Sequence, residues 1–381
     1  MSNPLFMFIA GDPSGDHNSA AIIRKLRAEI PGARCYGIGG PKMQAEGFEP
    51  LLPFEGFNRM GYWEVLKNLP FFLRAKKLIS KKLRDDRPRI LVCVDFSGFN
   101  TQIMKAAHAM NIPVLWYIAP KIWAWKKKKH TTNLKRYATH VALIFPFEQE
   151  IFLPYIKEVS FVGNPLAEYI DAGGYAVSES KAADLRKKEV IRLAIVPGSR
   201  HQEVETMLPV MLAAYRLLKQ RYPNIQASVS RCGYIRDEEY QRFVKDTEVA
   251  LFDGPLEDLF LSSDLALVTS GTATLQTALM GVPMVIAYKT SPITYFICRT
   301  FIKELRHIGL PNIIARDDVV PECIQDDMTP QRLAGLLEQY IESADKYTVT
   351  VKKLISLKQE LGSKRPSIEV TNLIKRISRT G

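Results

Sequence analysis

The chain has 381 residues, of which 46% are hydrophobic and 24% charged, and its formal net charge at pH 7 is +12. This length predicts roughly two to three domains with sizeable cores, and the composition is ordinary for a globular protein. The five cysteines are scattered, with no CxxC pair and no histidine at metal-ligand spacing, so we expect them to be small core residues in a reducing cytosol rather than a metal site.

Neither a secretory signal nor a membrane span is expected. The first apolar run, Leu5–Ala10, has strand length, and the longest candidate span, Met284–Ile302, is interrupted by Lys289 and Arg299. The positive charge nevertheless requires an acidic partner, which could be nucleic acid, an anionic membrane surface or a phosphorylated substrate.

The first predicted strand, Leu5–Ala10, runs into the loop Gly11–Asp16, and a helix is expected from about His17 to Ile30. The loop lacks the G-x-G-x-x-G spacing of a dinucleotide site. Its carboxylates, Asp12 and Asp16, argue against phosphate and favour a sugar hydroxyl or an amine. A helix cap explains Asp16 equally well.

A basic region with large apolar residues follows the second predicted strand, Arg34–Ile38, and one helical turn at 42–46. A helix is expected to start at Met60–Leu66, and Pro70 separates it from a second helix, Phe71–Leu83. Aromatic and aliphatic residues beside a basic face are typical of a helix at a membrane interface. The alternative is a core helix with cations near its C-terminal end. The predicted membrane contacts are Trp63, Leu66, Leu69, Phe71, Phe72, Leu73, Arg74, Lys76 and Lys77.

An aspartate ends the next apolar strand, Ile90–Val94. Because ligands of open α/β sheets bind beyond the carboxyl ends of the strands, Asp95 is the candidate general base. The alternative is a capping role for the helix that begins near Asn100, and His17 is a local rival for the base.

A Trp and Lys cluster follows the strand Val114–Ile118. Trp123, Trp125 and the lysines at 126–129 could stack bases and bind phosphates, or could form a rim at a membrane. Strands are then expected at Val141–Phe145 and Ser160–Val162, and a polar stretch places a domain boundary within 164–190.

The second half contains two turns that could bind phosphate. Each joins a buried strand to a helix through small or hydroxylated residues: Pro197–Arg200 after Arg192–Val196, and Ser270–Thr272 after Asp264–Val268. Such turns expose main-chain amides at the positive end of a helix, and Arg200 adds a guanidinium. Two of them suggest a diphosphate ligand, although ordinary turns closed by small residues would look similar. The other elements expected here are helices at 202–220, 240–247, 256–262, 273–280, 329–342, 344–362 and 367–378, and strands at 225–230, 249–252 and 284–288.

The chain is therefore predicted to be α/β, with two doubly wound halves in series. Its ordered motifs resemble those of the lipid-A-disaccharide synthase family over nearly the whole length. The motifs are 11–16, 37–43, 60–66, 95–100, 120–125, 146–148, 197–203, 270–275, 283–289, 310–312 and 320–322.

The resemblance implies the glycosyltransferase B architecture, in which two Rossmann-like domains face a cleft and the C-terminal helix crosses back to the first domain. We expect an acceptor and membrane-contact domain at 1–163, a UDP-sugar domain at 164–345 and C-terminal helices at 346–381.

The resemblance to this family also implies a reaction. UDP-2,3-diacylglucosamine donates its sugar to the 6-hydroxyl of 2,3-diacylglucosamine 1-phosphate (lipid X), giving the β-1,6 disaccharide 1-phosphate and UDP in lipid A biosynthesis. No metal or cofactor is expected. The implied location is the cytoplasm, peripherally on the anionic inner membrane of a Gram-negative bacterium. Whether the chain forms a homodimer is left open.

The roles implied for single residues divide between the two halves. Asp95 and Arg200 are catalytic, and Asp95 takes the proton from the attacking hydroxyl. The UDP diphosphate is assigned to Ser199, Arg200, Ser270, Gly271, Thr272, Ala273 and Thr274, the ribose or uracil to Gln276 and Asn312, and the acceptor side to Asp12, Ser14, Asp16 and Asn100.

Three positions depart from the family pattern. Asp12 stands where the family usually has Glu, and Asn164 where it often has His. Gln276 replaces a common Glu that grips the ribose hydroxyls in related transferases, and its amide loses the charge assistance of a carboxylate.

Two other functions remain as alternatives. Another nucleotide-sugar enzyme of the same architecture, such as an N-acetylglucosaminyl transferase on a lipid carrier or a UDP-sugar 2-epimerase, would share the diphosphate turns. A nucleic-acid-binding protein would explain the charge and the Trp and Lys cluster, but it gives no reason for two diphosphate turns, and no nucleic-acid partner is expected.

Overall fold

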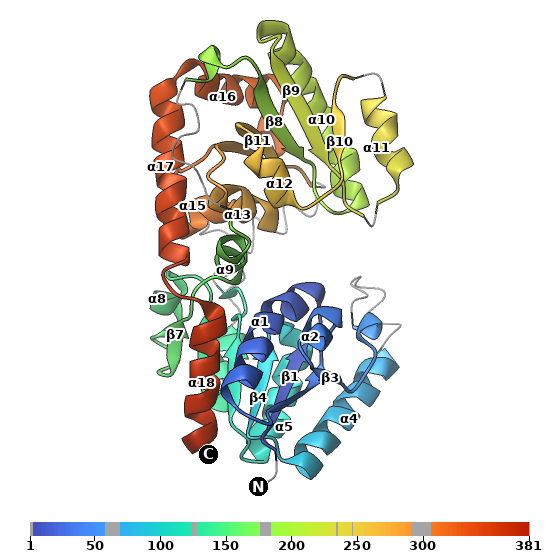
Figure 1. Cartoon of the computed structure of the whole chain (residues 1–381), viewed down its shortest axis with the longest axis vertical. Coiled ribbons are helices and arrows are strands. Elements are labelled where there is room, and N and C mark those ends of the chain that lie inside the picture. The colour runs from blue at the N-terminus through green and yellow to red at the C-terminus, as the bar shows by residue number, and fades with distance from the viewer. Residues whose placement is uncertain are drawn as a thin grey trace. The chain divides into compact units, whose positions relative to one another are not determined.

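The structure is a computed structural model, and it describes residues 3–57, 69–122, 128–175, 184–233, 235–245, 247–290 and 306–380. The chain divides into two compact units (Figure 1). The first contains residues 1–168 and 361–381, and the second contains residues 169–360.

The first unit is built on a parallel seven-stranded sheet in the order β3-β2-β1-β4-β5-β6-β7. Its central strands are apolar on both faces, as expected for a parallel sheet covered by helices on both sides. The strands are β1 (Leu5–Ala10), β2 (Arg34–Ile38), β3 (Glu49–Pro50), β4 (Ile90–Val94), β5 (Val114–Tyr117), β6 (His140–Leu143) and β7 (Val159–Phe161).

The C-terminal helix α18 (Pro366–Thr380) completes the first unit by packing on α1 (Pro13–Glu29). Ile23 and Leu26 of α1 share a buried cluster with Val370 and Ile374 of α18, so the expected return of the chain end to the first domain is confirmed (Figure 1). The other helices of this unit are α2 (Pro41–Ala45), α4 (Leu69–Asp86), α5 (Ser97–Ala109), α7 (Lys128–Tyr137), α8 (Glu148–Phe152) and α9 (Pro165–Ala172), the last of which runs into the second unit.

The second unit has a parallel six-stranded sheet in the order β10-β9-β8-β11-β12-β13. Its strands are β8 (Ile191–Val196), β9 (Ile225–Ser230), β10 (Ala250–Phe252), β11 (Leu265–Thr269), β12 (Met284–Tyr288) and β13 (Glu322–Ile324). Its helices are α10 (His201–Arg221), α11 (Asp237–Val244), α12 (Leu256–Leu261), α13 (Thr272–Leu279), α15 (Leu310–Ala315), α16 (Pro330–Glu342) and α17 (Ala344–Leu361), whose last residue belongs to the first unit.

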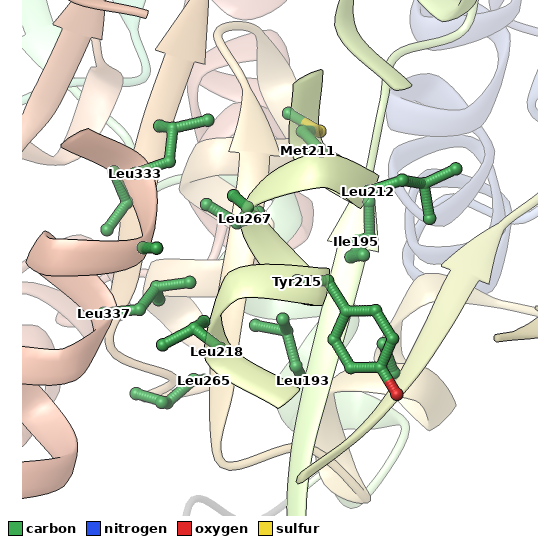
Figure 2. Packing of buried hydrophobic residues seen from close by; sticks show 14 of the residues in the cluster. Leu193, Ile195, Met211, Leu212, Tyr215, Leu218, Leu265, Leu267, Leu333 and Leu337 are labelled. Carbon is green, nitrogen blue, oxygen red and sulfur yellow. The ribbon is translucent and has the colours of Figure 1, made fainter. Parts of the chain in front are cut away.

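The core of the second unit lies between its central strands and the helices α10 and α16. Figure 2 shows leucines of β8 and β11 facing Leu218 of α10 and Leu337 of α16. Both leucines are fully buried. This contact holds α10 and α16 side by side on one face of the sheet.

The two-domain Rossmann-like prediction is confirmed, and most predicted strands agree with the structure to within two residues. The first helix begins at Pro13 rather than near His17, because Asp12 caps it and proline fits a first helical turn. The segment expected as C-terminal helices, 346–381, is divided: Tyr347 and Val351 of α17 are buried in the core of the second unit, and only α18 joins the first. The strands β3 and β13 and the helices α7, α8, α9 and α15 were not predicted.

Within the described ranges, no helix has both the length and the apolar character needed to cross a membrane.

Replacing Leu337 by Ala should lower the free energy of unfolding by about 2–5 kcal/mol, because it removes a fully buried side chain and leaves a cavity. Urea unfolding followed by circular dichroism measures the change. Leu261 is 45% exposed in the same unit, so Leu261→Ala is the matched control and should change stability much less. Equal losses in the two variants would contradict the assigned core.

Candidate active site

The predicted site residues gather at one place in each sheet. In the first sheet, the chain adds strands β2 and β3 on one side of β1 and strands β4 to β7 on the other, so the strand order reverses between β1 and β4. In the second sheet, the same reversal lies between β8 and β11. Ligands of open α/β sheets bind beyond the carboxyl ends of the strands at such a switch point. Asp12 follows β1 and Asp95 follows β4, while Arg200 follows β8 and Ser270 follows β11.

Asp95 lies on a sharp turn between β4 and α5. Both Asp95 and Phe96 have left-handed backbone conformations, with φ of 42° and 45°, which are unusual for residues other than glycine. Asn100 holds this turn, because its side-chain amide donates hydrogen bonds to the carbonyl oxygens of Asp95 (2.9 Å) and Val94 (3.1 Å). Asn100 is fully buried, so this geometry favours a supporting role over the direct acceptor contact predicted for it.

The surroundings of Asp95 suit a proton acceptor. The pKa of Asp95 is raised to about 6, first by burial and then by the negative charge of Asp12, while the charge of Lys121 and a hydrogen bond from the Phe96 amide act in the opposite direction. A carboxylate whose pKa lies near neutrality is both deprotonated at pH 7 and basic enough to take a proton. Lys121 was not identified from the sequence, and only its position after β5 could have pointed to it.

The other acidic residues of the first loop have structural partners. One Asp12 oxygen accepts a hydrogen bond from the Gly15 amide at 2.5 Å. The Asp16 carboxylate accepts hydrogen bonds from the amides of Gly40, Lys42 and Met43 at 2.9–3.1 Å, which caps α2. Asp16 therefore has few free lone pairs for an acceptor.

Ser14 and His17, near the same loop, each contact another side chain. Ser14 is exposed, and its hydroxyl accepts a long hydrogen bond from Asn18 at 3.4 Å. His17 lies with its Nδ1 2.6 Å from the Lys42 ammonium nitrogen. That contact places a cationic neighbour beside the rival base.

An aromatic cluster lies beside the Asp95 turn and contains part of the region predicted to contact a membrane. The rings of Phe57, Phe71, Phe72, Phe96 and Phe99 pack with centroids 4.8–6.4 Å apart. Phe71 and Phe72 are half-buried against the core of the first unit. The sequence did not indicate this packing, because the partner rings come from distant parts of the chain.

The remaining predicted membrane contacts separate by exposure. Leu69 and Leu73 are 51% and 57% exposed on α4. Arg74 and Lys77 are exposed and Lys76 is half-buried. Trp63 and Leu66, like the aromatic residues of the Trp and Lys cluster, lie outside the described residues.

The turn between β11 and α13 carries open main-chain amides. Among the described residues, the amides of Gly271, Thr272 and Ala273 have no hydrogen-bond partner, and Gly271 and Thr272 are exposed. A Cβ atom added at Gly271 would meet nothing within 4 Å, so the space above the turn is open. Amides at a helix N-terminus favour an anion there. The hydroxyls of Ser270 and Thr274 instead bond to the carbonyl oxygens of Ile308 and Gly271.

The second turn predicted to bind phosphate is occupied by the chain itself. One Glu203 oxygen accepts hydrogen bonds from the amides of Ser199 (3.0 Å) and Arg200 (3.3 Å), and the other lies 3.1 Å from the Arg200 guanidinium. The expectation of bare amides here is wrong, because Glu203 closes a capping box. A glutamate three residues after the cap was the sequence signal for it. The Arg200 side chain is 79% exposed, and an exposed ion pair of this kind is weak enough to be replaced by a phosphate.

Asn312, predicted to contact ribose or uracil, is fully buried. Its side-chain amide donates to the carbonyl oxygen of Val320 and to Glu322, both at 2.8 Å, and its oxygen accepts from the amides of Val319 and Val320. Glu322 also accepts from the amides of Ile308 and Gly309. Because Ser270 bonds to Ile308, this network supports the α13 turn, which favours a structural role for Asn312. The role of Glu322 was not foreseen.

Gln276, the other residue predicted to contact ribose or uracil, is half-buried on α13 and donates a hydrogen bond to Glu257 of α12 at 2.6 Å. In the part of the chain that the structure describes, no three His, Cys, Asp or Glu side chains gather into a group that could hold a metal ion.

The two Rossmann-like units define the class of protein by its fold, which is the glycosyltransferase B fold. The fold is shared with the crystal structure of MurG from Acinetobacter baumannii, with a TM-score of 0.61, 17% identity and coverage of 98% of this chain and 99% of that one. It is shared equally with the UDP-GlcNAc 2-epimerase from Neisseria meningitidis, with a TM-score of 0.61, 12% identity and coverage of 99% of both chains.

The particular family follows from sequence comparison. The family model described as lipid-A-disaccharide synthetase matches residues 6–373. The lipid-A-disaccharide synthase of Trichlorobacter lovleyi is 33% identical over 360 residues, which cover 93% of each chain. The chain belongs to the lipid-A-disaccharide synthase family, and it has the activity of that family, a glycosyl transfer in lipid A biosynthesis.

Replacing Asn312 by Ala should lower the free energy of unfolding by about 1–3 kcal/mol, because it leaves buried amide and carbonyl groups without partners. Thermal unfolding measures this loss. If Asn312 instead serves only the nucleotide, Asn312→Ala will unfold like the wild-type protein and lose affinity for UDP alone.

Proposed function

We propose that the protein transfers 2,3-diacylglucosamine from its UDP derivative to the 6-hydroxyl of 2,3-diacylglucosamine 1-phosphate. A bond forms between that hydroxyl oxygen and the anomeric carbon, and the bond from the anomeric carbon to the diphosphate breaks. The products are the β-1,6-linked disaccharide 1-phosphate and UDP. Because an α-linked donor gives a β-linked product, one inverting displacement is the simplest route.

Asp95 is the general base of this proposal. The displacement needs a group that accepts the proton of the attacking hydroxyl, and a carboxylate with a pKa of about 6 is suited to that step near neutral pH. The position of Asp95 on the turn that follows β4, at the first switch point, is the observation that carries the proposal. The negative charge of Asp12 helps to keep Asp95 basic.

The leaving diphosphate is assigned to the second unit. Charge builds on its oxygens as the bond to the sugar breaks, and fixed donors aimed at such charge lower the barrier. The open amides of Gly271, Thr272 and Ala273 supply main-chain donors. Arg200 supplies a positive charge once a phosphate replaces Glu203 as its partner, and Ser199 lies on the same turn. Ser270 and Thr274 shape the α13 turn through their own hydrogen bonds.

The proposed location is the cytoplasmic face of the inner membrane of a Gram-negative bacterium, with peripheral attachment. Substrates with several acyl chains stay in a bilayer, since each buried CH₂ contributes about 0.8 kcal/mol. The first turns of α4 present Leu69 and Leu73 to solvent next to the exposed Arg74 and Lys77. An apolar pair beside basic residues suits an anionic membrane surface.

Activity should depend on pH through Asp95. With a pKa of about 6, kcat/KM should fall about tenfold per pH unit below pH 6 and level off above it, because only the carboxylate accepts a proton. Mass spectrometry of the disaccharide formed from synthetic acylated donor and acceptor measures the rate. Asp95→Asn should abolish turnover and keep UDP binding.

Asp95→Asn, which should abolish turnover, should also make the folded protein more stable. Folding raises the pKa of Asp95 above its unfolded value, so the charged form is disfavoured in the folded protein above pH 6. Asp95→Asn should therefore unfold at a higher temperature than the wild-type protein at pH 8. Near-normal turnover by this variant would remove Asp95 from the mechanism.

Replacing Leu69 and Leu73 by Ser should weaken binding to vesicles that contain anionic lipid by about tenfold or more, because two exposed apolar side chains are lost from the contact. Cosedimentation with vesicles measures binding. Leu153, 52% exposed in the same unit but away from α4, gives the control variant Leu153→Ser. Phe71 and Phe72 are left intact because their loss would disturb the aromatic cluster. Unchanged vesicle binding by the double variant would rule out this contact.

A further inference from the structure

A largely buried carboxylate with few hydrogen-bond partners lies beside α13. Glu257, on α12, is 3% exposed and accepts a hydrogen bond from the Gln276 amide at 2.6 Å. Within the described residues, this is the one hydrogen bond of the Glu257 side chain, and no cationic side chain forms an ion pair with it. The other carboxylate oxygen has no donor within the described residues, and it is not one of the side-chain atoms that are both fully buried and unpartnered, so it keeps contact with solvent. An open carboxylate oxygen without a donor can accept hydrogen bonds from a ligand.

The accessible face of α13 connects the open amides to the pair formed by Gln276 and Glu257. Thr272, Ala273 and Gln276 are the residues of this helix that are not buried. They are spaced three and four apart, so they share one face. This face begins at the open amides and reaches Gln276 one helical turn later, a distance of about 5.4 Å along the axis. Gln276 then contacts Glu257 on the neighbouring helix.

The ligand chemistry that matches this spacing is a nucleoside diphosphate. Its ribose is joined to the diphosphate by a single ester linkage, so the ribose hydroxyls lie about one helical turn from a phosphate bound at the amides. Dinucleotide folds recognise ribose hydroxyls with an Asp or Glu carboxylate, because these hydroxyls are donors. A carboxylate nearer the amides would repel the phosphates, and a neutral amide alone would form weaker hydrogen bonds.

We propose that Glu257 is the carboxylate that binds the ribose hydroxyls of the UDP donor and that Gln276 is a positioning residue for it. This inference rests on the proposed function, since it takes the α13 turn as the diphosphate site. It also accounts for the glutamine at position 276, because the negative charge that Gln276 lacks comes from the adjacent helix.

Titration calorimetry with UDP and 2′-deoxy-UDP tests the assignment. The wild-type protein should bind UDP at least tenfold more tightly than 2′-deoxy-UDP. Glu257→Gln should lose most of this preference by weakening UDP binding about tenfold, with little change for 2′-deoxy-UDP. Asp258→Asn, on the exposed neighbour in the same helix, is the matched control and should keep the preference. Gln276→Ala should raise the donor KM and leave kcat nearly unchanged.

The possible results separate the two proposals. Wild-type protein that binds UDP and 2′-deoxy-UDP equally well would overturn the Glu257 assignment and leave the diphosphate site standing, and this comparison needs no variant to fold. A folded Glu257→Gln variant that keeps the wild-type preference would also overturn it. Failure of the wild-type protein to bind UDP at all would instead overturn the proposed function, and the assignment with it.

Discussion

The convergence of parallel strand ends at one point of each sheet is the constraint on which the candidate site depends. In both units the strand order reverses at one pair of neighbouring strands, β1 and β4 in the first sheet and β8 and β11 in the second. The helices that follow these two strands lie on opposite faces of the sheet, which leaves a crevice for a ligand beyond the strand ends. Asp95 leaves one such pair and Ser270 leaves the other. The buried, apolar strands hold both loops at fixed positions, so residues far apart in sequence become parts of one chemical arrangement on each unit.

Carboxylates near these loops divide into two groups according to their hydrogen bonds. Asp16, Glu203 and Glu322 accept main-chain amides and thereby hold α2, the β8–α10 turn and the support of the α13 turn. Asp95 and Glu257 have fewer hydrogen-bond partners, and burial raises the pKa of Asp95. The proposed chemistry uses Asp95 and Glu257, because a carboxylate whose oxygens already accept several main-chain amides has few lone pairs available for a substrate.

Much of the fold could be predicted from the sequence. Strands such as Ile90–Val94 are uninterrupted apolar runs, and glycine-containing loops mark their ends, so local composition determines where they lie. The helix α4 was placed correctly within a few residues, but its partners were not. Phe71 and Phe72 looked like membrane contacts because no local pattern indicates that Phe57 and Phe99 pack against them.

The sequence by itself determined the α/β class, the two doubly wound halves, the family and the loops that carry the site, because these depend on local patterns and ordered motifs. Only the tertiary structure decided which amides and side chains in those loops are available to bind a ligand. The amides of Gly271, Thr272 and Ala273 are open and Asn312 bonds inward, whereas Glu203 closes the amides of Ser199 and Arg200 by a local contact that the sequence signals. Availability depends on hydrogen bonds between groups that only folding brings within reach, such as Glu257 and Gln276.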